Sequence, residues 1–417
     1  MDLRDFVDAL LRFESVARAE APAQQWVKNR LHDFGFDTYE WTADPARLAE
    51  HPSFPDDPDD PDDIDTANRP SVAGVVEFGD PDAGPTLVLD GHVDVVPADR
   101  ELWSHDPFLP DWDDEAGTVS ARGAADMKAG VAACVFAALD LRDAVEAGDI
   151  DLDGQVVVES VVGEEEGGIG AAAAALENPY PFERDAALVA EPTRLKPVVA
   201  TEGSVMKRLR LTGRTAHAAS RWRGVDVIEK FEAIREAFFD LEAERTDAVS
   251  HPLYDYPIPW PVCVGRVEAG TWASSVAGTL TAEWRLGVAP GETVAEVEAA
   301  FEERLSRVVA DDEWLSAHPP AFERFSVQFE PAEIDADEPV VESLRAALRA
   351  DGRDDDPVGA TYGADSRHYV EAGIPTVLFG PGDIDQAHFP DETVEWEEVE
   401  VARDVIRETA TRFLQSR

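Results

Sequence analysis

The chain has 417 residues, of which 44% are hydrophobic, and this composition supports a packed core in roughly two or three domains. Its 36 basic and 87 acidic residues leave a net charge of −51, which excludes non-specific binding to nucleic acid or to an anionic membrane because both surfaces are negative. No apolar run reaches the ~20 residues that a membrane span needs, and residues 1–5 do not resemble a signal peptide.

Helices and strands are predicted to alternate over residues 1–200. Apolar residues at helical spacing predict helices over residues 3–13, 23–34, 127–146 and 171–176. Short apolar runs bounded by glycine or proline predict strands over residues 72–78, 86–90, 155–162 and 186–190. This alternation indicates an α/β fold with a mixed, mostly parallel sheet and helices on both faces.

An acidic segment, residues 56–63, precedes the first of these strands and reads DDPDDPDD. It predicts a solvated loop, because prolines and like charges do not pack together. A calcium loop of the EF-hand type is not expected, since Pro58 and Pro61 interrupt the required pattern of acids.

The pattern changes near residue 200. Strands are predicted over residues 205–211, 262–267, 280–286 and 324–329, and helices over residues 225–241 and 294–309. This βαββαβ order is typical of a ferredoxin-like α+β plate. A helix over residues 339–350 and a strand over residues 376–379 then resume the first pattern. We therefore predict an α/β domain from residues 1–200 and 330–417, interrupted by an inserted domain of residues 201–329.

The acidity and the few cysteines indicate the setting of the protein. Basic residues are nearly all arginine, and lysine occurs at only five positions. In molar salt the Debye length falls to ~3 Å, so repulsion among the excess carboxylates is screened. Cys134 and Cys263 are the only cysteines, which suits a reducing compartment. We expect a halophilic, cytoplasmic protein; an ordinary acidic protein is the alternative.

Histidine and carboxylate side chains flank several predicted elements. His92 and Asp94 follow the strand over residues 86–90 and lie two residues apart, so both point the same way on an extended chain. A carboxylate that holds the second ring nitrogen of a histidine is typical of a metal ligand; an ordinary polar turn is the alternative. Asp126 stands just ahead of the helix over residues 127–146, where it is either a metal ligand or a helix N-cap.

Three adjacent carboxylates, Glu164 to Glu166, follow the strand over residues 155–162. They repel one another unless a cation lies nearby; a solvated acidic turn is the alternative. Residues 168–173 also match the dinucleotide fingerprint G-x-G-x-x-A, with Glu191 about 20 residues further on. Three carboxylates beside a pyrophosphate argue against a nucleotide site.

Glu191 ends the strand over residues 186–190, and His388 follows the strand over residues 376–379. Ligands of open α/β sheets bind beyond the carboxyl ends of the strands. Glu191 and His388 are therefore candidates to lie together at one rim of the sheet, with His92, Asp126 and Glu165. Two imidazoles and three carboxylates, one of them bridging, suit a two-zinc site, although cobalt and manganese are compatible with the same ligands.

Six motifs in this chain resemble those of the M20 metallopeptidase and deacylase family. They are GHVDVVP (91–97), GAADMKAG (123–130), GEEEGG (163–168), AEPT (190–193), GRTAHAAS (213–220) and AHFPDE (387–392). The stretch from Tyr362 to Gly382 is most similar to the acetylornithine deacetylase and succinyl-diaminopimelate desuccinylase branch. Two positions depart from the family pattern: Gly163 stands where aspartate is usual, and residues 274–277 replace an Asn-x-Val-Pro stretch of the lid.

The resemblance implies a fold of the zinc-peptidase type and two divalent metal ions per chain. The implied metal ligands are the bridging Asp126, His92 and Glu191 on one ion, and Glu165 and His388 on the other. Glu164 is the implied general base, and Asp94 supports His92. The inserted domain is implied to be a lid and dimerisation domain of a homodimer, in which His217 reaches the partner's site and stabilises the oxyanion.

The expected reaction is hydrolysis of an amide. Water between two cations is readily deprotonated, and Glu164 would take that proton and deliver it to the leaving amine. No G-x-S-x-G nucleophile motif occurs in the chain. Arg285 and Arg367 are candidates for holding a substrate carboxylate, and surface ion pairs with the many acids are the alternative.

The expected substrate is a small N-acyl amino acid or a related amine, from which the enzyme removes the acyl group. Glutamate at position 191 is typical of deacylases and carboxypeptidases within the resembled family. A metallo-carboxypeptidase or dipeptidase on the same scaffold is one alternative, and a binding protein that retains the fold without activity is another.

Overall fold

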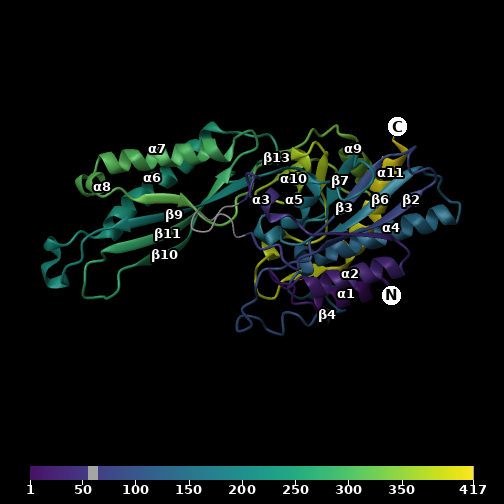
Figure 1. The fold of residues 1–417 in the computed structure, drawn as a ribbon, viewed down its shortest axis with the longest axis horizontal. Helices are drawn as coiled ribbons and strands as arrows, with labels where there is room; N and C mark the ends of the chain where they lie inside the picture. Colours follow the sequence, from purple (N-terminus) through teal and green to yellow (C-terminus); the bar gives the residue numbers. More distant parts are fainter. Residues whose placement is uncertain (55–63, 417) are drawn as a thin grey trace.

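The computed structural model describes residues 1–54 and 64–416, so the predicted acidic loop over residues 56–63 lies outside the described part. Two units lie end to end along the long axis of the molecule (Figure 1). The main unit is built on a nine-stranded sheet, and the inserted unit, residues 203–324, on a four-stranded sheet. Only Glu202 separates the last residue of one sheet, Thr201, from the first residue of the other, Gly203.

The sheet of the main unit has the strand order β1-β2-β6-β3-β7-β15-β8-β13, with β14 paired to β8. Its strands are β1 (Asp37–Trp41), β2 (Ser71–Phe78), β3 (Thr86–Asp90), β6 (Gly154–Ser160), β7 (Ala186–Val189), β8 (Val198–Thr201), β13 (Ala332–Glu333), β14 (Val358–Ala360) and β15 (Thr376–Leu378). The central strands β6, β3, β7 and β15 run parallel, whereas β1, β2 and β13 pair antiparallel with their neighbours. The predicted α/β fold class is confirmed.

Helices cover both faces of this sheet. They are α1 (Leu3–Leu11), α2 (Ala21–Asp33), α3 (Pro45–Leu48), α4 (Ala129–Glu146), α5 (Ile169–Leu176), α9 (Pro339–Ala350), α10 (Ser366–Glu371) and α11 (Trp396–Gln415). Val156 and Val158 of β6 belong to the apolar cluster that contains α1, α2, α4, α9 and α11, whereas Val157 packs with α5 and α10 on the other face. The central strands are therefore buried on both sides, as parallel sheets require.

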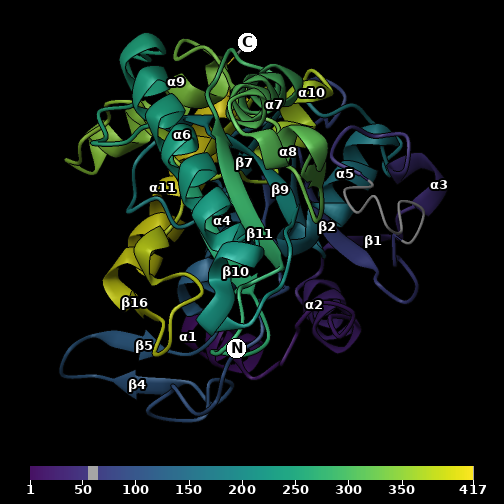
Figure 2. The same cartoon turned by 90° about the vertical axis from the view of Figure 1, so that its left-hand side faces the viewer.

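The inserted unit has the strand order β10-β11-β9-β12, and every neighbouring pair is antiparallel. Its elements are β9 (Gly203–Thr212), η3 (Ala218–Arg223), α6 (Val227–Ala248), β10 (Val262–Ala269), β11 (Thr279–Val288), α7 (Val294–Ala310), α8 (Glu313–Ala317) and β12 (Ala321–Arg324). Helices α6 and α7 lie along one face of the sheet, and Figure 2 views the molecule from this end. The predicted ferredoxin-like plate is confirmed, and it has an apolar core of its own.

A small third sheet, β16-β5-β4, is formed by β4 (Asp111–Asp113), β5 (Thr118–Ser120) and β16 (Thr393–Glu395). It joins residues near the C-terminus to the segment that precedes Asp126. Within the described residues, no helix is both long enough and apolar enough to cross a membrane.

Several boundaries differ from the prediction. The last strand of the inserted unit was predicted over residues 324–329 but is β12, Ala321–Arg324; Ser326 adopts a positive φ of 61°, which ends the extended backbone. Helix α4 begins at Ala129 rather than at Met127, because Ala124–Lys128 forms a separate turn, η1. The C-terminal helix α11 was not predicted at all.

Candidate metal centre

The candidate ligands lie at the carboxyl ends of the parallel strands. His92 follows β3, the short helix η2 (Glu164–Glu166) follows β6, and Glu191 follows β7. His388 comes after β15 and the short helix η4 (Ile384–Gln386). Because these strands run parallel, the loops that follow them meet at one edge of the sheet.

A first group of possible ligands consists of His92, Asp126 and Glu191. One donor atom from each lies within 4.8 Å of the others, and all three side chains are buried. The Nε2 atom of His92 lies 3.1 Å from Oδ1 of Asp126. Asp126 is not the N-cap of α4, since that position is Lys128; it sits inside the η1 turn.

A second group consists of Asp126, Glu165 and His388, whose donor atoms also lie within 4.8 Å of one another. The Nε2 atom of His388 is 3.1 Å from Oε1 of Glu165 and 3.7 Å from Oδ2 of Asp126. Asp126 thus directs one carboxylate oxygen toward each histidine, which is the placement of a bridging ligand. The structure brings the five predicted ligands together in two overlapping groups.

The electrostatics of this cluster suit a cation. Burial, together with repulsion from neighbouring carboxylates, raises the pKa of Glu164, Glu165 and Glu191. Although burial opposes it, the hydrogen bond to Asp126 raises the pKa of His92, and the same contact lowers the pKa of Asp126. Buried acids that repel one another are stabilised by a divalent ion, and imidazole with carboxylate is a common ligand set. The donor set therefore fits two divalent metal ions.

Asp94 supports the centre differently from the prediction. The Nδ1 atom of His92 lies 2.9 Å from the backbone carbonyl oxygen of Asp94 and 3.6 Å from its Oδ1. The other carboxylate oxygen, Oδ2, accepts a hydrogen bond from the backbone nitrogen of Glu165 at 3.1 Å. Asp94 therefore contacts the loops of both groups, through its carbonyl at His92 and through its carboxylate at Glu165.

The three adjacent glutamates have separate surroundings. Glu165 contacts His388, and Glu166 forms a 2.6 Å ion pair with the buried Arg69. Glu164 is 8% exposed, and within the described residues its carboxylate has no ion-pair partner. Of the three, Glu164 is the carboxylate that remains available for proton transfer.

The glycines of the predicted dinucleotide fingerprint are explained by close packing instead. A Cβ on Gly168 would meet Oδ1 of Asp365 at 2.3 Å, and one on Gly170 would meet Oγ of Ser71 at 2.3 Å. Gly168 also has a φ of +80°, which side chains rarely adopt. These glycines therefore allow η2 and α5 to approach their neighbours.

Two buried acids that the sequence did not indicate lie near the centre. The carboxylate of Glu392 is fully buried, and it accepts hydrogen bonds from the backbone of the η1 segment and from Arg122. Asp365 lies beside η2, and burial raises its pKa to about 6. Glu392 belongs to the AHFPDE motif, but in a chain with 87 acids nothing else in the sequence distinguishes it.

The two arginines predicted to hold a substrate carboxylate are engaged by the protein itself. Arg285 Nη1 lies 3.0 Å from Glu202 Oε1 and also donates to backbone carbonyls. Arg367 is buried, donates to the carbonyl oxygens of Ala364 and Gly167, and stacks over Phe329. The structure therefore presents neither guanidinium freely to a ligand.

His217 lies in the inserted unit, apart from both ligand groups. It is exposed, its Nδ1 accepts a hydrogen bond from the backbone nitrogen of Ala219, and it forms an isolated bridge with Ser275. It precedes η3 and lies five residues after the end of β9, the strand that starts at the junction with the main unit.

Comparison with known proteins places these features in a family. Residues 88–412 match the family model of peptidase family M20/M25/M40. An N-formyl-4-amino-5-aminomethyl-2-methylpyrimidine deformylase of Bacillus subtilis (strain 168) is 27% identical over 403 residues, covering 92% of this chain and 87% of that protein. An acetylornithine deacetylase of Erwinia tasmaniensis is 27% identical over 335 residues, covering 78% of this chain and 80% of that protein. The crystal structure of an M20 family metallo-carboxypeptidase from Sulfolobus solfataricus has the same fold, with a TM-score of 0.72 at 16% identity over 100% of both chains.

Proposed function

Since the chain belongs to peptidase family M20/M25/M40, a family of amide-bond hydrolases, we propose that it is a two-metal deacylase that removes the acyl group from an N-acyl amino acid or a related amine. The observation that carries the proposal is the pair of ligand groups that share Asp126. Two relatives, a deformylase and a deacetylase, are named for removing acyl groups from nitrogen, which favours deacylation over peptide cleavage.

The proposal assigns His92 and Glu191 to one metal ion and Glu165 and His388 to the other, with Asp126 between them. Zinc is the proposed metal, with cobalt or manganese as alternatives. When bound, the two ions polarise the amide carbonyl and lower the pKa of water.

Glu164 is the proposed general base. Its carboxylate accepts a proton from the attacking water and donates it to the nitrogen of the leaving amine as the carbon–nitrogen bond breaks. Burial raises the pKa of Glu164, which helps this carboxyl retain the proton between the two steps. Asp94 orients the ring of His92 through its carbonyl oxygen and holds the Glu165 loop through its carboxylate.

The inserted unit is proposed as a lid and dimerisation domain. His217 follows the ten-residue strand β9, which starts at the junction with the main unit and spans about 33 Å. This distance supports a role in the partner's site rather than in the site of its own subunit. Trp222, five residues after His217, and Trp272, three residues before the Ser275 that bridges His217, are 76% and 73% exposed, and large exposed apolar side chains are typical of protein interfaces.

A substrate panel tests the proposal. Purified enzyme, supplied with zinc or cobalt in molar KCl, is assayed against N-formyl, N-acetyl and N-succinyl amino acids and amines, and against dipeptides. Turnover of at least one N-acyl series, with dipeptides slower, is the expected result. Turnover of dipeptides alone would contradict deacylation.

A metallo-carboxypeptidase or dipeptidase is the second candidate function, favoured by the fold shared with the Sulfolobus metallo-carboxypeptidase. A binding protein without activity is the third. Metal analysis separates it from both enzymes: fewer than one metal ion per chain after zinc loading would indicate that the ligand groups do not function as a two-metal site.

A further inference from the structure

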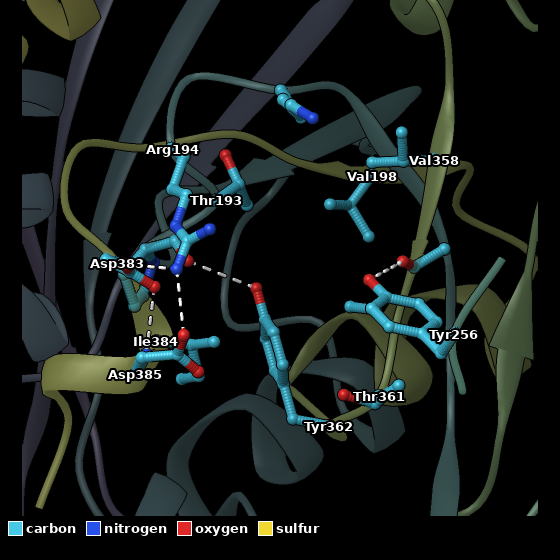
Figure 3. A pocket seen from close by; sticks show the side chains of 14 residues that line it. Thr193, Arg194, Val198, Tyr256, Val358, Thr361, Tyr362, Asp383, Ile384 and Asp385 are labelled. Atoms are coloured by element: carbon cyan, nitrogen blue, oxygen red, sulfur yellow. Dashed lines mark hydrogen bonds and ion pairs between the residues drawn. The ribbon is translucent and has the colours of Figure 1, made fainter. Parts of the chain in front are cut away.

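A cavity of about 210 Å³ adjoins the candidate metal centre (Figure 3). Its wall comes from the turn after Glu191, from β14 and the residues that follow it, from η4 and Asp383, and from Tyr256 of the inserted unit. Valine, isoleucine and tyrosine side chains line part of it, and threonine and charged side chains line the rest. The cavity therefore has room for an apolar part of a ligand. Its polar side chains determine which chemical group at the end of that part is bound.

The cavity packs directly against residues next to the ligands. The hydroxyl of Tyr362, which stands in its wall, donates to the carbonyl oxygen of Pro192 at 3.3 Å, one residue after Glu191. Gly382, the residue before Asp383 of the wall, approaches the other ligand segment: a Cβ on it would lie 3.2 Å from the Cβ of Ala125, the residue before Asp126. A substrate whose amide lies at the metal centre can therefore extend its remote end into this cavity.

Lys196, at the edge of the cavity, differs from the other lysines of the chain. Lys28, Lys207 and Lys230 each pair with a carboxylate, and the buried Lys128 donates to a backbone carbonyl. Lys196 is exposed and, within the described residues, has no carboxylate partner. An unpaired ammonium at a cavity is notable in a chain with 87 acidic residues, because acids are available to neutralise it almost anywhere on the surface.

The backbone of the turn positions this lysine. Arg194 and Leu195 adopt positive φ angles of 54° and 57°, which residues other than glycine rarely do, and such outliers cluster at functional sites. Hydrogen bonds hold the turn, from the backbone nitrogen of Arg194 to Gly382 O at 2.8 Å and from that of Lys196 to Thr193 O at 3.2 Å.

Arg194, the other cation of the wall, is already neutralised. Its guanidinium pairs with both Asp383 and Asp385, as the dashed lines of Figure 3 show. These two aspartates are the acids of the wall, so the four charges of the wall sum to zero, but both carboxylates contact Arg194 and neither contacts Lys196 within the described residues.

We propose that this cavity is the subsite for the end of the substrate remote from the scissile amide, and that Lys196 binds a substrate carboxylate there. The inference rests on the proposed deacylase function and narrows its substrate class to N-acyl compounds that carry a carboxylate on an apolar stem. The substrate carboxylate would then bind Lys196 rather than Arg285 or Arg367, whose guanidinium groups already form contacts within the protein.

Kinetics with matched substrates test this subsite. An N-acyl amino acid and its carboxamide, which differ only in charge, are assayed with wild type, Lys196→Gln and Lys196→Arg at the lowest KCl concentration that keeps the enzyme folded. Lys196→Gln should raise KM for the carboxylate about 10–100-fold, the range expected for one lost charged hydrogen bond, with kcat and the carboxamide kinetics unchanged. Lys196→Arg should retain most of the affinity, and Lys28→Gln, which removes a lysine elsewhere on the main unit, should change neither substrate.

A binding measurement separates failure of this inference from failure of the proposed function. Calorimetry in the Glu164→Gln background, loaded with zinc, records the affinity for the same N-acyl amino acid without turnover. Weaker binding on adding Lys196→Gln supports the subsite even if no substrate is turned over. Equal effects on carboxylate and carboxamide, or no effect in either measurement, would overturn it. If free acetate inhibits the carboxylate and the carboxamide substrate equally, the site binds a free anion, and the proposed subsite is also overturned.

Discussion

The carboxylate of Glu392 accepts a hydrogen bond from the backbone nitrogen of Asp126 at 3.1 Å, and its same oxygen accepts another from Ala125 at 2.8 Å. Its second oxygen binds the backbone nitrogen of Gly123 and the guanidinium of Arg122. Glu392 also lies four residues after His388. A single buried carboxylate therefore links the segment of the proposed bridging ligand to the segment of a proposed terminal ligand.

Replacing this carboxylate by an amide should weaken metal binding. Glu392→Gln places an NH₂ group where backbone donors point, so the η1 turn shifts and Asp126 loses its position. Loss of such supporting contacts typically costs ~10–100-fold in metal affinity or activity. Competition with a fluorescent zinc chelator measures the affinity; an unchanged value in a folded variant would remove Glu392 from this role.

Glu164→Gln should retain both metal ions and lose turnover. The amide is close in size to the acid but cannot accept a proton, and loss of a general base typically costs ~10²–10⁴-fold in rate. Rate and metal content are measured together. Glu166→Gln is the matched control, because Glu166 is paired with Arg69 and should retain most of the activity. Wild-type activity in Glu164→Gln would instead assign the role to a neighbouring carboxylate.

His217→Ala should lower turnover by ~10²–10³-fold, the usual cost of one lost oxyanion donor, while metal content stays unchanged. Mixing His217→Ala with Glu164→Gln tests whether the site is shared between subunits. Heterodimers should regain activity, because one of their two sites then combines an intact Glu164 with an intact His217. No recovery, although subunits exchange, would show that His217 does not act across the interface.

Glu202, at the junction of the two sheets, should make stability depend on pH. Burial raises its pKa from 4.5 to about 7, although Arg285 opposes the shift. Between these values the folded state holds a proton that the unfolded state has lost, so the free energy of unfolding falls as the pH rises from 4.5 to 7. Above pH 7, ionisation of the buried Glu202 lowers the free energy of unfolding by at most about 3 kcal/mol.

Glu202→Gln removes this titration. The variant should therefore be more stable than wild type at pH 8, and the difference should vanish near pH 4.5. Chemical denaturation of both proteins across this range gives the difference directly, and other titrating groups cancel. A variant that is less stable at every pH would show that the ion pair with Arg285 outweighs the burial of the charge.

Salt should stabilise the protein. The Debye length is ~10 Å at 0.1 M salt and ~3 Å at 1 M, so the repulsion created by a net charge of −51 is screened in molar KCl. Tm should rise from dilute buffer to molar KCl and should rise less in a non-ionic solute of equal osmolality. An unchanged Tm would contradict the expected adaptation to salt.

Apolar runs in the sequence predicted most elements of the fold. The candidate ligands were predicted from their positions after the strands, because parallel strands place the residues that follow them at one edge of the sheet. The sequence did not indicate which of the acidic residues are buried. In a chain with 87 acids, Glu392, Asp365 and Glu202 read like surface residues, and their burial depends on contacts with distant segments. Helix α11 carries Val399, Ala402 and Val405 at helical spacing, but dense charges conceal that pattern.

The single residue between β8 and β9 makes the inserted unit a lever arm. Strand β9 begins at Gly203, directly after Glu202, and extends along the inserted unit to Thr212, five residues before His217 (Figure 1). With an arm of about 33 Å, a rotation of about 10° at the junction carries the tip through about 6 Å, which is larger than the reach of a hydrogen bond. The angle at Glu202 therefore sets the position of His217 relative to the main unit, and if His217 acts in a partner's site as proposed, a substitution at Glu202 should change turnover without contacting either ligand group.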